Sequence, residues 1–431
     1  MAEMKDSDIR WIGQIPKKWK VIRVKDAFTR KKAKAKQENP VILSLARSGV
    51  KVRDITNNEG QLAENYSDYN PVMVDDLLLN PMDLISGDNC NISKIEGVIS
   101  PAYVNLRYKK GINPEFYNFY FKYQYWCKAF FAYGKGVSFE NRWTLNYDIL
   151  ERFPLILPSI EEQNRIVKFL KEKCAEIDAL HTDIEKQIET LEEYKKSIIT
   201  EAVTKGLDPD VEMKDSGIEW IGMIPKNWNV TRIGYESWIR ARLGWKGLKA
   251  EEYVLEGHPF LSAFNIIQNK ISWDELNYIT NERYNESPEI MLKVGDIVLV
   301  KDGAGIGKCA KIDSLPYETA TTNGSLAVIS STVEKLDYNY LYFYLQSAMF
   351  QNYILRIMNG MGVPHLSQEE LRKIKIPFPP INEQIEIAKY LEKKRNDIDM
   401  AILEKIQQIE TLEQYKKSVI YEYVTGKKEV Q

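Results

Sequence analysis

Apolar side chains recur every seven residues along two long segments of this chain, with charged and amide residues between them. The first stripe contains Leu170, Ile177, Ile184, Leu191 and Ile198. The second contains Leu391, Ile398, Leu412 and Val419, and is interrupted by Lys405. Each pattern predicts a long helix that needs a partner helix. Pairing between two chains is one solution, but antiparallel pairing within the chain is simpler. It would place a globular segment at each end of a rod of roughly 70 Å.

The framework around these helices occurs twice. Met4–Arg23 returns 209 residues later as Met213–Arg232, and Leu157–Leu170 returns 221 residues later as Phe378–Leu391. Between Ala27 and Ala102 no secure alignment with residues 236–320 can be made. We therefore expect internal pseudo-two-fold symmetry, with one scaffold presenting two different surfaces. Such an arrangement suits a target that is itself bipartite and asymmetric.

The globular segments read as mixed α/β. Residues 296–300 and 308–312 predict strands around a glycine-rich turn, while residues 114–131 and 340–358 predict aromatic-rich helices. The predicted fold is two similar globular domains separated by two long antiparallel coiled-coil helices. The predicted segments are residues 1–157 and 209–377 for the domains, and 158–208 and 378–431 for the helices, the last with a C-terminal tail.

Composition indicates a globular protein, with 44% hydrophobic and 28% charged residues. No apolar run is long enough to span a membrane and the N-terminus is polar, which favours the cytoplasm. The net charge of −2 hides an uneven distribution, because residues 1–157 carry +6 and residues 158–212 carry −6. The basic first domain mildly favours a nucleic-acid partner.

The sequence contains only incomplete matches to motifs for catalysis or metal binding. Gly303–Lys308 lacks the first glycine and the final Ser/Thr of a phosphate loop and leads into a predicted strand, so a tight hairpin or a loop of close backbone approach is expected. Asn80-Pro81-Met82 resembles an amino-methyltransferase motif but lacks the second proline and the aromatic ring. The four cysteines and three histidines are scattered without metal-ligand spacing, so neither a metal nor a cofactor is expected.

Basic residues near the segments that do not repeat are the candidates for DNA contact. Lys and Arg neutralise phosphates, and Arg can also read base edges. In the first half they are Arg30, Lys31, Lys32, Lys34, Lys36, Arg47, Lys51, Arg53, Lys135 and Arg142. In the second half they are Arg240, Arg242, Lys246, Lys249, Lys301, Lys308 and His365.

Three motifs, each present twice, together resemble those of the specificity (S) subunit of type I restriction-modification systems. They are the paired Trp-Ile-Gly-x-Ile-Pro motifs at Trp11–Pro16 and Trp220–Pro225, the Glu-Gln helix starts at Glu162 and Glu383, and the Tyr-Lys-Lys-Ser helix ends at Tyr194 and Tyr415. The resemblance implies a non-catalytic DNA reader with two target recognition domains and a helical spacer. It also implies partners: double-stranded DNA, two methyltransferase subunits and two restriction subunits, with the cofactors held by those subunits.

Two other functions stay open on the sequence alone. A methyltransferase fused to its own reader would bind S-adenosylmethionine as an isolated chain. A purely structural coiled-coil adaptor would not bind DNA even when assembled with its partners.

Overall fold

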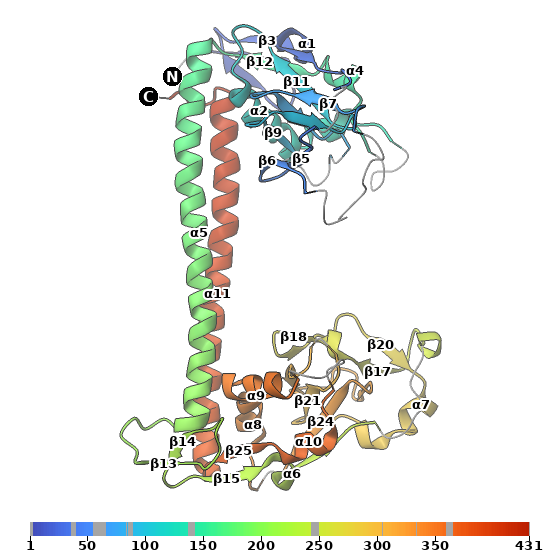
Figure 1. Cartoon of the computed structure of the whole chain (residues 1–431), viewed down its shortest axis with the longest axis vertical. Helices are drawn as coiled ribbons and strands as arrows, with labels where there is room; N and C mark the ends of the chain where they lie inside the picture. The colour runs from blue at the N-terminus through green and yellow to red at the C-terminus, as the bar shows by residue number, and fades with distance from the viewer. Residues whose placement is uncertain are drawn as a thin grey trace. The chain divides into compact units, whose positions relative to one another are not determined.

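The chain forms two compact units. The computed structural model describes residues 3–35, 40–54, 66–82, 84, 89–136, 143–242, 250–303, 305–332, 334–358 and 365–430. Unit 1 consists of Met1–Ile184 and Ile406–Gln431, and unit 2 consists of Glu185–Lys405. Each unit has its own hydrophobic core, and both long helices contribute to both units (Figure 1).

Unit 1 is built on a four-stranded antiparallel sheet with the strand order β4-β11-β8-β9. These strands are β4 (Phe28–Arg30), β8 (Leu77–Leu79), β9 (Cys90–Ile92) and β11 (Val104–Tyr108). Two-stranded pairs surround it: β1 (Met4–Asp6) with β2 (Gln14–Pro16), β3 (Lys20–Arg23) with β12 (Pro154–Leu157), β5 (Leu43–Ala46) with β6 (Gly49–Val52), and β7 (Asn70–Val72) with β10 (Gly97–Ile99). The short helices are α1 (Val24–Ala27), α2 (Pro114–Trp126), α3 (Ala129–Tyr133) and α4 (Tyr147–Leu150).

Unit 2 contains a sheet of the same design, with the order β16-β24-β21-β22. These strands are β16 (Ser237–Arg240), β21 (Ile297–Val300), β22 (Cys309–Lys311) and β24 (Leu326–Ser331). The smaller sheets are β13 (Met213–Asp215) with β14 (Met223–Pro225), β15 (Asn229–Arg232) with β25 (Lys375–Phe378), β17 (His258–Leu261) with β20 (Asn277–Ile279) and β23 (Thr321–Thr322), and β18 (Ile266–Ile267) with β19 (Lys270–Ile271). The helices are α6 (Ile233–Glu236), η1 (Ala250–Glu252), η2 (Ala263–Asn265), α7 (Asn281–Asn285), η3 (Pro288–Ile290), α8 (Tyr338–Gln346), α9 (Ala348–Met358) and α10 (Gln368–Lys373).

The two sheets show which residues of the two units correspond in the region where the sequences could not be aligned. Asp76 directly precedes β8 and accepts a hydrogen bond from Met73 N at 2.8 Å, while Asp296 precedes β21 and accepts from Lys293 N at 2.8 Å. The cation that pairs with each carboxylate has moved by one strand. Arg107 on the central β11 holds Asp76 at 2.6 Å, whereas Arg240 on the edge strand β16 holds Asp296 at 2.6 Å. The two ion pairs thus occupy matching places in the two sheets although their cations come from different strands.

The aromatic helices are each broken where one helix was predicted. In unit 1 the break falls at Lys128, whose backbone is left-handed (φ 58°), between α2 and α3. In unit 2 it falls at Ser347, whose hydroxyl donates to Tyr344 O at 2.6 Å and accepts from Phe350 N at 3.3 Å. Both breaks let the following helix turn back onto the core. The two strands predicted at 296–300 and 308–312 are confirmed as β21 and β22.

The repeated motifs form a joint between each domain and a long helix. In unit 1, Trp19 Nε1 donates to Glu162 at 3.3 Å, and the buried Gln163 accepts from Asn113 N at 2.8 Å and donates to Pro158 O at 3.0 Å. In unit 2, the same contacts join Trp228 to Glu383 at 2.9 Å, and Gln384 to Asp337 N at 2.9 Å and Pro379 O at 2.8 Å. These fully buried amides explain why a Glu-Gln pair recurs.

The two predicted long helices are α5 (Ile160–Lys205) and α11 (Ile381–Val424). They lie antiparallel within each unit. In unit 1, Asp178 pairs with Lys416 at 2.6 Å and His181 lies 3.9 Å from Glu413. In unit 2, Lys195 pairs with Asp399 at 2.9 Å. The stripe is interrupted at Lys405, whose ammonium instead donates to Gln187 at 2.5 Å.

Burial along the predicted apolar stripe is uneven. Leu170, Ile177, Leu391, Ile398 and Val419 are buried. Ile184, Leu191, Ile198 and Leu412 are half-buried. The helices are therefore packed most tightly where the globular parts of each unit add to the core. In the part of the chain that the structure describes, no helix is both long enough and apolar enough to cross a membrane.

Each long helix ends at a glycine that packs on the tryptophan motif. Gly426 (φ +71°) ends α11, and a side-chain carbon added there would lie 2.4 Å from Pro16 and 2.9 Å from Trp19. Gly206 (φ +78°) follows the end of α5, where an added carbon would lie 3.3 Å from Trp228 and 3.8 Å from Pro225. The left-handed backbone favours glycine at both positions, and at Gly426 the close approach requires it as well. Lys427 then donates to Ile12 O at 2.8 Å, which fixes the end of α11 to the first β-hairpin.

Candidate nucleic-acid interface

The sheet of unit 2 gathers basic residues from distant parts of the chain at one end. Arg240 pairs with Val328, Val300 with Leu326 and Leu299 with Cys309 in the antiparallel register. Arg242, Lys301 and Lys308 therefore lie just beyond strand ends that share one end of the sheet. We call Arg242, Lys301, Asp302, Lys308 and His365 the strand-end surface of unit 2.

The same end of the sheet in unit 1 also carries cations. Lys31 and Lys32 follow β4, and both are exposed. Lys135 is exposed and forms a β-bridge to Thr144, and Leu145 N donates to Pro81 O at 2.8 Å just beyond β8. In unit 2 the matching bond runs from Leu366 N to Lys301 O at 2.8 Å. The two units thus use one frame to present different side chains at the same place.

A charge cluster occupies the centre of the strand-end surface of unit 2. Asp302 pairs with Lys301 at 2.7 Å and with Nδ1 of His365. Lys301 is only 12% exposed and its ammonium is paired with Asp302, so it offers little charge to a partner. The imidazole of His365 is more than half exposed. With Nδ1 held by the carboxylate, Nε2 is the ring nitrogen left for an external partner. Lys308 is exposed at the edge of the same surface.

Arg240 belongs to the core and not to this surface. Its side chain is 5% exposed and that of Asp296 is 4% exposed. The guanidinium also donates to Met291 O at 3.2 Å and to Ser330, and stacks 4.7 Å from the Trp238 ring. The placement of Arg240 among the DNA-contact residues is therefore corrected: its donors are already used inside unit 2.

The matching ion pair of unit 1 is also internal. Burial raises the pKa of Asp76 above its ordinary value, against the opposing effects of a backbone N–H and of Arg107. Lys31, which occupies the strand position that Arg240 has in unit 2, adds a weaker attraction. The charge here holds the start of β8 in place.

The remaining predicted cations of unit 1 lie on the β5–β6 hairpin, at the end of β4, or in the segments that follow these elements. Arg47 and Lys51 are exposed on the β5–β6 hairpin, and Arg53 follows it half-buried. Arg30 is half-buried and stacks 4.4 Å from the Tyr147 ring. Lys34 is exposed and pairs with Asp68 at 2.7 Å.

The hairpin is fixed to the sheet by Asn91, whose amide donates to Ala46 O at 3.1 Å. Four predicted contact residues, Lys36, Arg142, Lys246 and Lys249, lie outside the described residues.

Comparison with known proteins decides the family. Residues 16–190 and 247–411 match the family model of the type I restriction modification DNA specificity domain. The chain belongs to the type I specificity subunits. It is 29% identical over 361 residues to the type I restriction enzyme MjaVIII specificity subunit of Methanocaldococcus jannaschii, covering 82% of this chain and 80% of that protein. It is 28% identical over 432 residues to the putative MjaX specificity subunit of the same organism, covering 96% and 95%.

Solved structures share the fold of this specificity subunit. A chain from a structure of a type I R-M system matches with a TM-score of 0.70 at 15% identity, covering 95% of this chain and 98% of that chain. The HsdS subunit from Thermoanaerobacter tengcongensis matches with a TM-score of 0.54 at 14% identity, covering 96% and 98%. The mixed α/β fold is thus found in proteins whose sequences have diverged widely.

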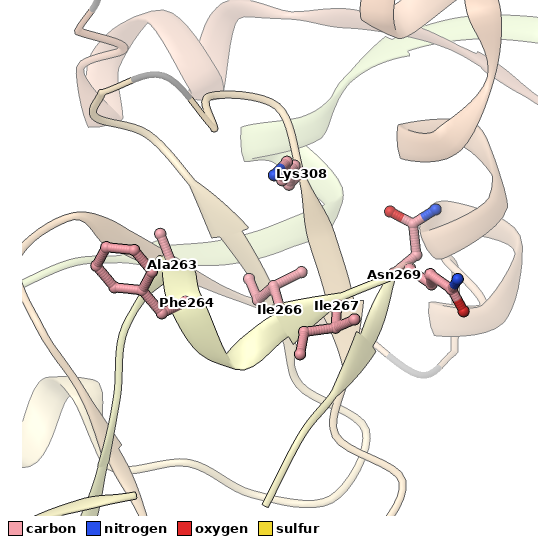
Figure 2. A pocket seen from close by; sticks show the side chains of 7 residues that line it. Ala263, Phe264, Ile266, Ile267, Asn269 and Lys308 are labelled. Atoms are coloured by element: carbon pink, nitrogen blue, oxygen red, sulfur yellow. The ribbon is translucent and has the colours of Figure 1, made fainter. Parts of the chain in front are cut away.

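The β18–β19 hairpin of this specificity subunit is among the elements that its sequence did not predict. The β18–β19 hairpin of unit 2 contacts β22, as the β5–β6 hairpin of unit 1 contacts the equivalent β9. Its turn residues Gln268 and Asn269 are left-handed (φ 49° and 60°), and Phe264 just before it is 92% exposed (Figure 2). The sequence signal for this hairpin was weak: a Gln-Asn pair between Ile266-Ile267 and Lys270-Ile271 lacks the glycine that usually marks such a turn.

Proposed function

We propose that this specificity subunit reads a bipartite, gapped DNA site, one half-site per unit. What supports the proposal is a single observation. Two sheets of the same strand order carry different side chains at the same end: Lys31, Lys32 and Lys135 in unit 1, and Lys308 and His365 in unit 2. Two different half-sites require the same backbone scaffold to carry different side chains at the DNA-facing positions.

In this proposal the globular parts are target recognition domains, at residues 1–157 and 209–377. The helical segments 158–208 and 378–431 form an antiparallel coiled-coil spacer with pseudo-two-fold symmetry. Reading one face of B-DNA at two places requires a separation near one helical turn or a multiple of it. A stiff helical spacer sets that separation, and its acidic surface stays with protein partners. Two methyltransferase subunits and two restriction subunits would assemble on the chain and supply the chemistry, the chain itself being non-catalytic.

The test is adenine-methylation mapping by single-molecule sequencing, using DNA from cells that carry this chain and its methyltransferase partner. The expected motif is two half-sites around a gap of fixed length. Exchange of residues 27–150 for the same region of a relative, with Trp19, Glu162 and Gln163 retained, is expected to change one half-site and leave the other and the gap intact. A continuous motif, or a change in both half-sites, would contradict the proposal.

A further inference from the structure

Two large apolar side chains face solvent together in unit 2. Phe264 is 92% exposed and Ile267 is 56% exposed. They border a hollow of about 410 Å³ whose other lining residues are Ala263, Ile266, Gln268, Asn269 and Lys308 (Figure 2). A single exposed apolar residue is common on protein surfaces, but an aromatic ring beside a second apolar side chain and a hollow indicates a surface that something covers.

The segment that carries Phe264 is held firmly. Ser262 and Asn265 bond reciprocally around η2, with Ser262 N donating to Asn265 Oδ1 at 2.9 Å, and Asn265 Nδ2 donates to Glu275 O at 3.0 Å. Ile266 is buried in the core beside Leu261. The exposed position of the ring is therefore built into the fold.

The far end of the hollow is fixed as well. The buried Tyr342 hydroxyl donates to Asn269 O at 2.6 Å, which ties the hairpin turn to α8. Figure 2 shows the Phe264 ring at one end of the hollow, Asn269 at the other, and Lys308 above the apolar strip between them. Because the backbone on both sides of Phe264 is fixed, little backbone freedom would be lost when the ring binds.

The chemistry around the hollow selects the class of partner. Among the described residues that line it, Lys308 carries the one charge and it is a cation, while Gln268 and Asn269 offer amides. The equivalent hairpin of unit 1 has the exposed Arg47 at its turn. Cation, amides and an aromatic ring together match a duplex, which offers phosphates, base edges and apolar base faces.

We propose that Phe264 is a wedge that enters a base-pair step of the half-site read by unit 2. Lys308 would neutralise a phosphate beside that step, and Gln268 and Asn269 would face base edges. Apolar wedges of this kind partly unstack a step and kink the duplex. Because pyrimidine–purine steps unstack most readily, the half-site of unit 2 is expected to contain one at this place. The inference rests on the proposed function and assigns a contact within it.

The experiment uses the complete complex with its methyltransferase subunits and a duplex carrying the mapped site. 2-Aminopurine, whose fluorescence rises when it is unstacked, is placed at successive positions of the half-site that unit 2 reads. The native complex is expected to raise the signal at one step. Phe264→Ala should abolish that rise and weaken binding about tenfold, as the loss of one base–aromatic contact would. Phe264→Trp should retain binding.

Two further variants separate the wedge from general effects. Leu255 is 96% exposed in the same unit but does not line the hollow, so Leu255→Ala should change neither the affinity for DNA nor the 2-aminopurine fluorescence. Lys308→Gln should lower the salt dependence of binding by about one phosphate contact while leaving the fluorescence rise in place.

The outcomes are distinguishable. A native complex that binds no specific DNA would overturn the proposed function itself. A native complex that binds its site, with Phe264→Ala unchanged in affinity and fluorescence, would overturn the wedge alone. Failure of Phe264→Ala to assemble with the methyltransferase subunits would show that a protein covers this ring, which also overturns the wedge.

Discussion

Arg240 offers a direct test of whether a conspicuous arginine supports the fold or contacts DNA. Arg240→Met removes three donated hydrogen bonds and leaves the 4% exposed Asp296 carboxylate buried without its cation. Breaking a buried pair on one side costs about 3–5 kcal/mol, because the remaining charge is uncompensated. Replacing both partners with apolar residues of similar size removes that penalty. The double variant Arg240→Met/Asp296→Leu is therefore expected to be more stable than Arg240→Met.

Hydrogen exchange read on peptides from β21 and β24 is the suitable assay, because a chain with two compact units need not unfold in one step. Arg240→Met should speed exchange in unit 2 and leave unit 1 peptides unchanged. Arg242→Met is the matched control, since Arg242 is half-exposed two residues further on and should shift stability by no more than about 0.5 kcal/mol.

The reasoning would be refuted if Arg240→Met exchanged as slowly as Arg242→Met. If Arg240→Met kept normal stability but its DNA binding depended less on salt, Arg240 would be a phosphate contact after all.

Three other predictions concern the joints, pH and thiols. Gln384→Leu leaves Lys335 O, Pro379 O and Asp337 N without their buried partner and should lower the free energy of unfolding by about 3 kcal/mol, as measured by denaturation. The control Gln408→Leu, at an exposed position of α11, should lower it little. Burial alone would raise the pKa of Glu115, but hydrogen bonds from Lys94 and Lys171 hold it below its ordinary value. Its stabilising effect is thus complete above the ordinary carboxyl pKa and is lost as pH falls through the lowered value. Glu115→Gln should cost about 0.5–1 kcal/mol near pH 7, and its difference in stability from the native chain should close in acid, as read by denaturation at several pH values. Burial raises the pKa of Cys309 to about 12, so iodoacetamide at pH 8 should label this thiol in denaturant and not in the native chain, as read by peptide mass spectrometry.

Local pattern was sufficient for the long helices, the repeated framework and the family. Heptad spacing reports a helix face directly, and the Trp and Glu-Gln motifs recur because each copy closes the same joint, as Trp19 with Glu162 and Trp228 with Glu383 show. The strands β21 and β22 were equally visible, being short apolar runs around a glycine turn.

Tertiary structure decided the rest, because the function of a charge depends on what surrounds it. Arg240 and Lys308 look alike in the sequence, yet one closes a buried ion pair and the other is exposed at a strand end. The equivalence of the two sheets was also hidden, since Asp76 and Asp296 take their cations from different strands. No sequence pattern distinguished Phe264; it is a candidate contact because its ring is exposed to solvent in the folded protein. Sequence determines which segments become helices and strands; packing determines which of their side chains remain available to a partner.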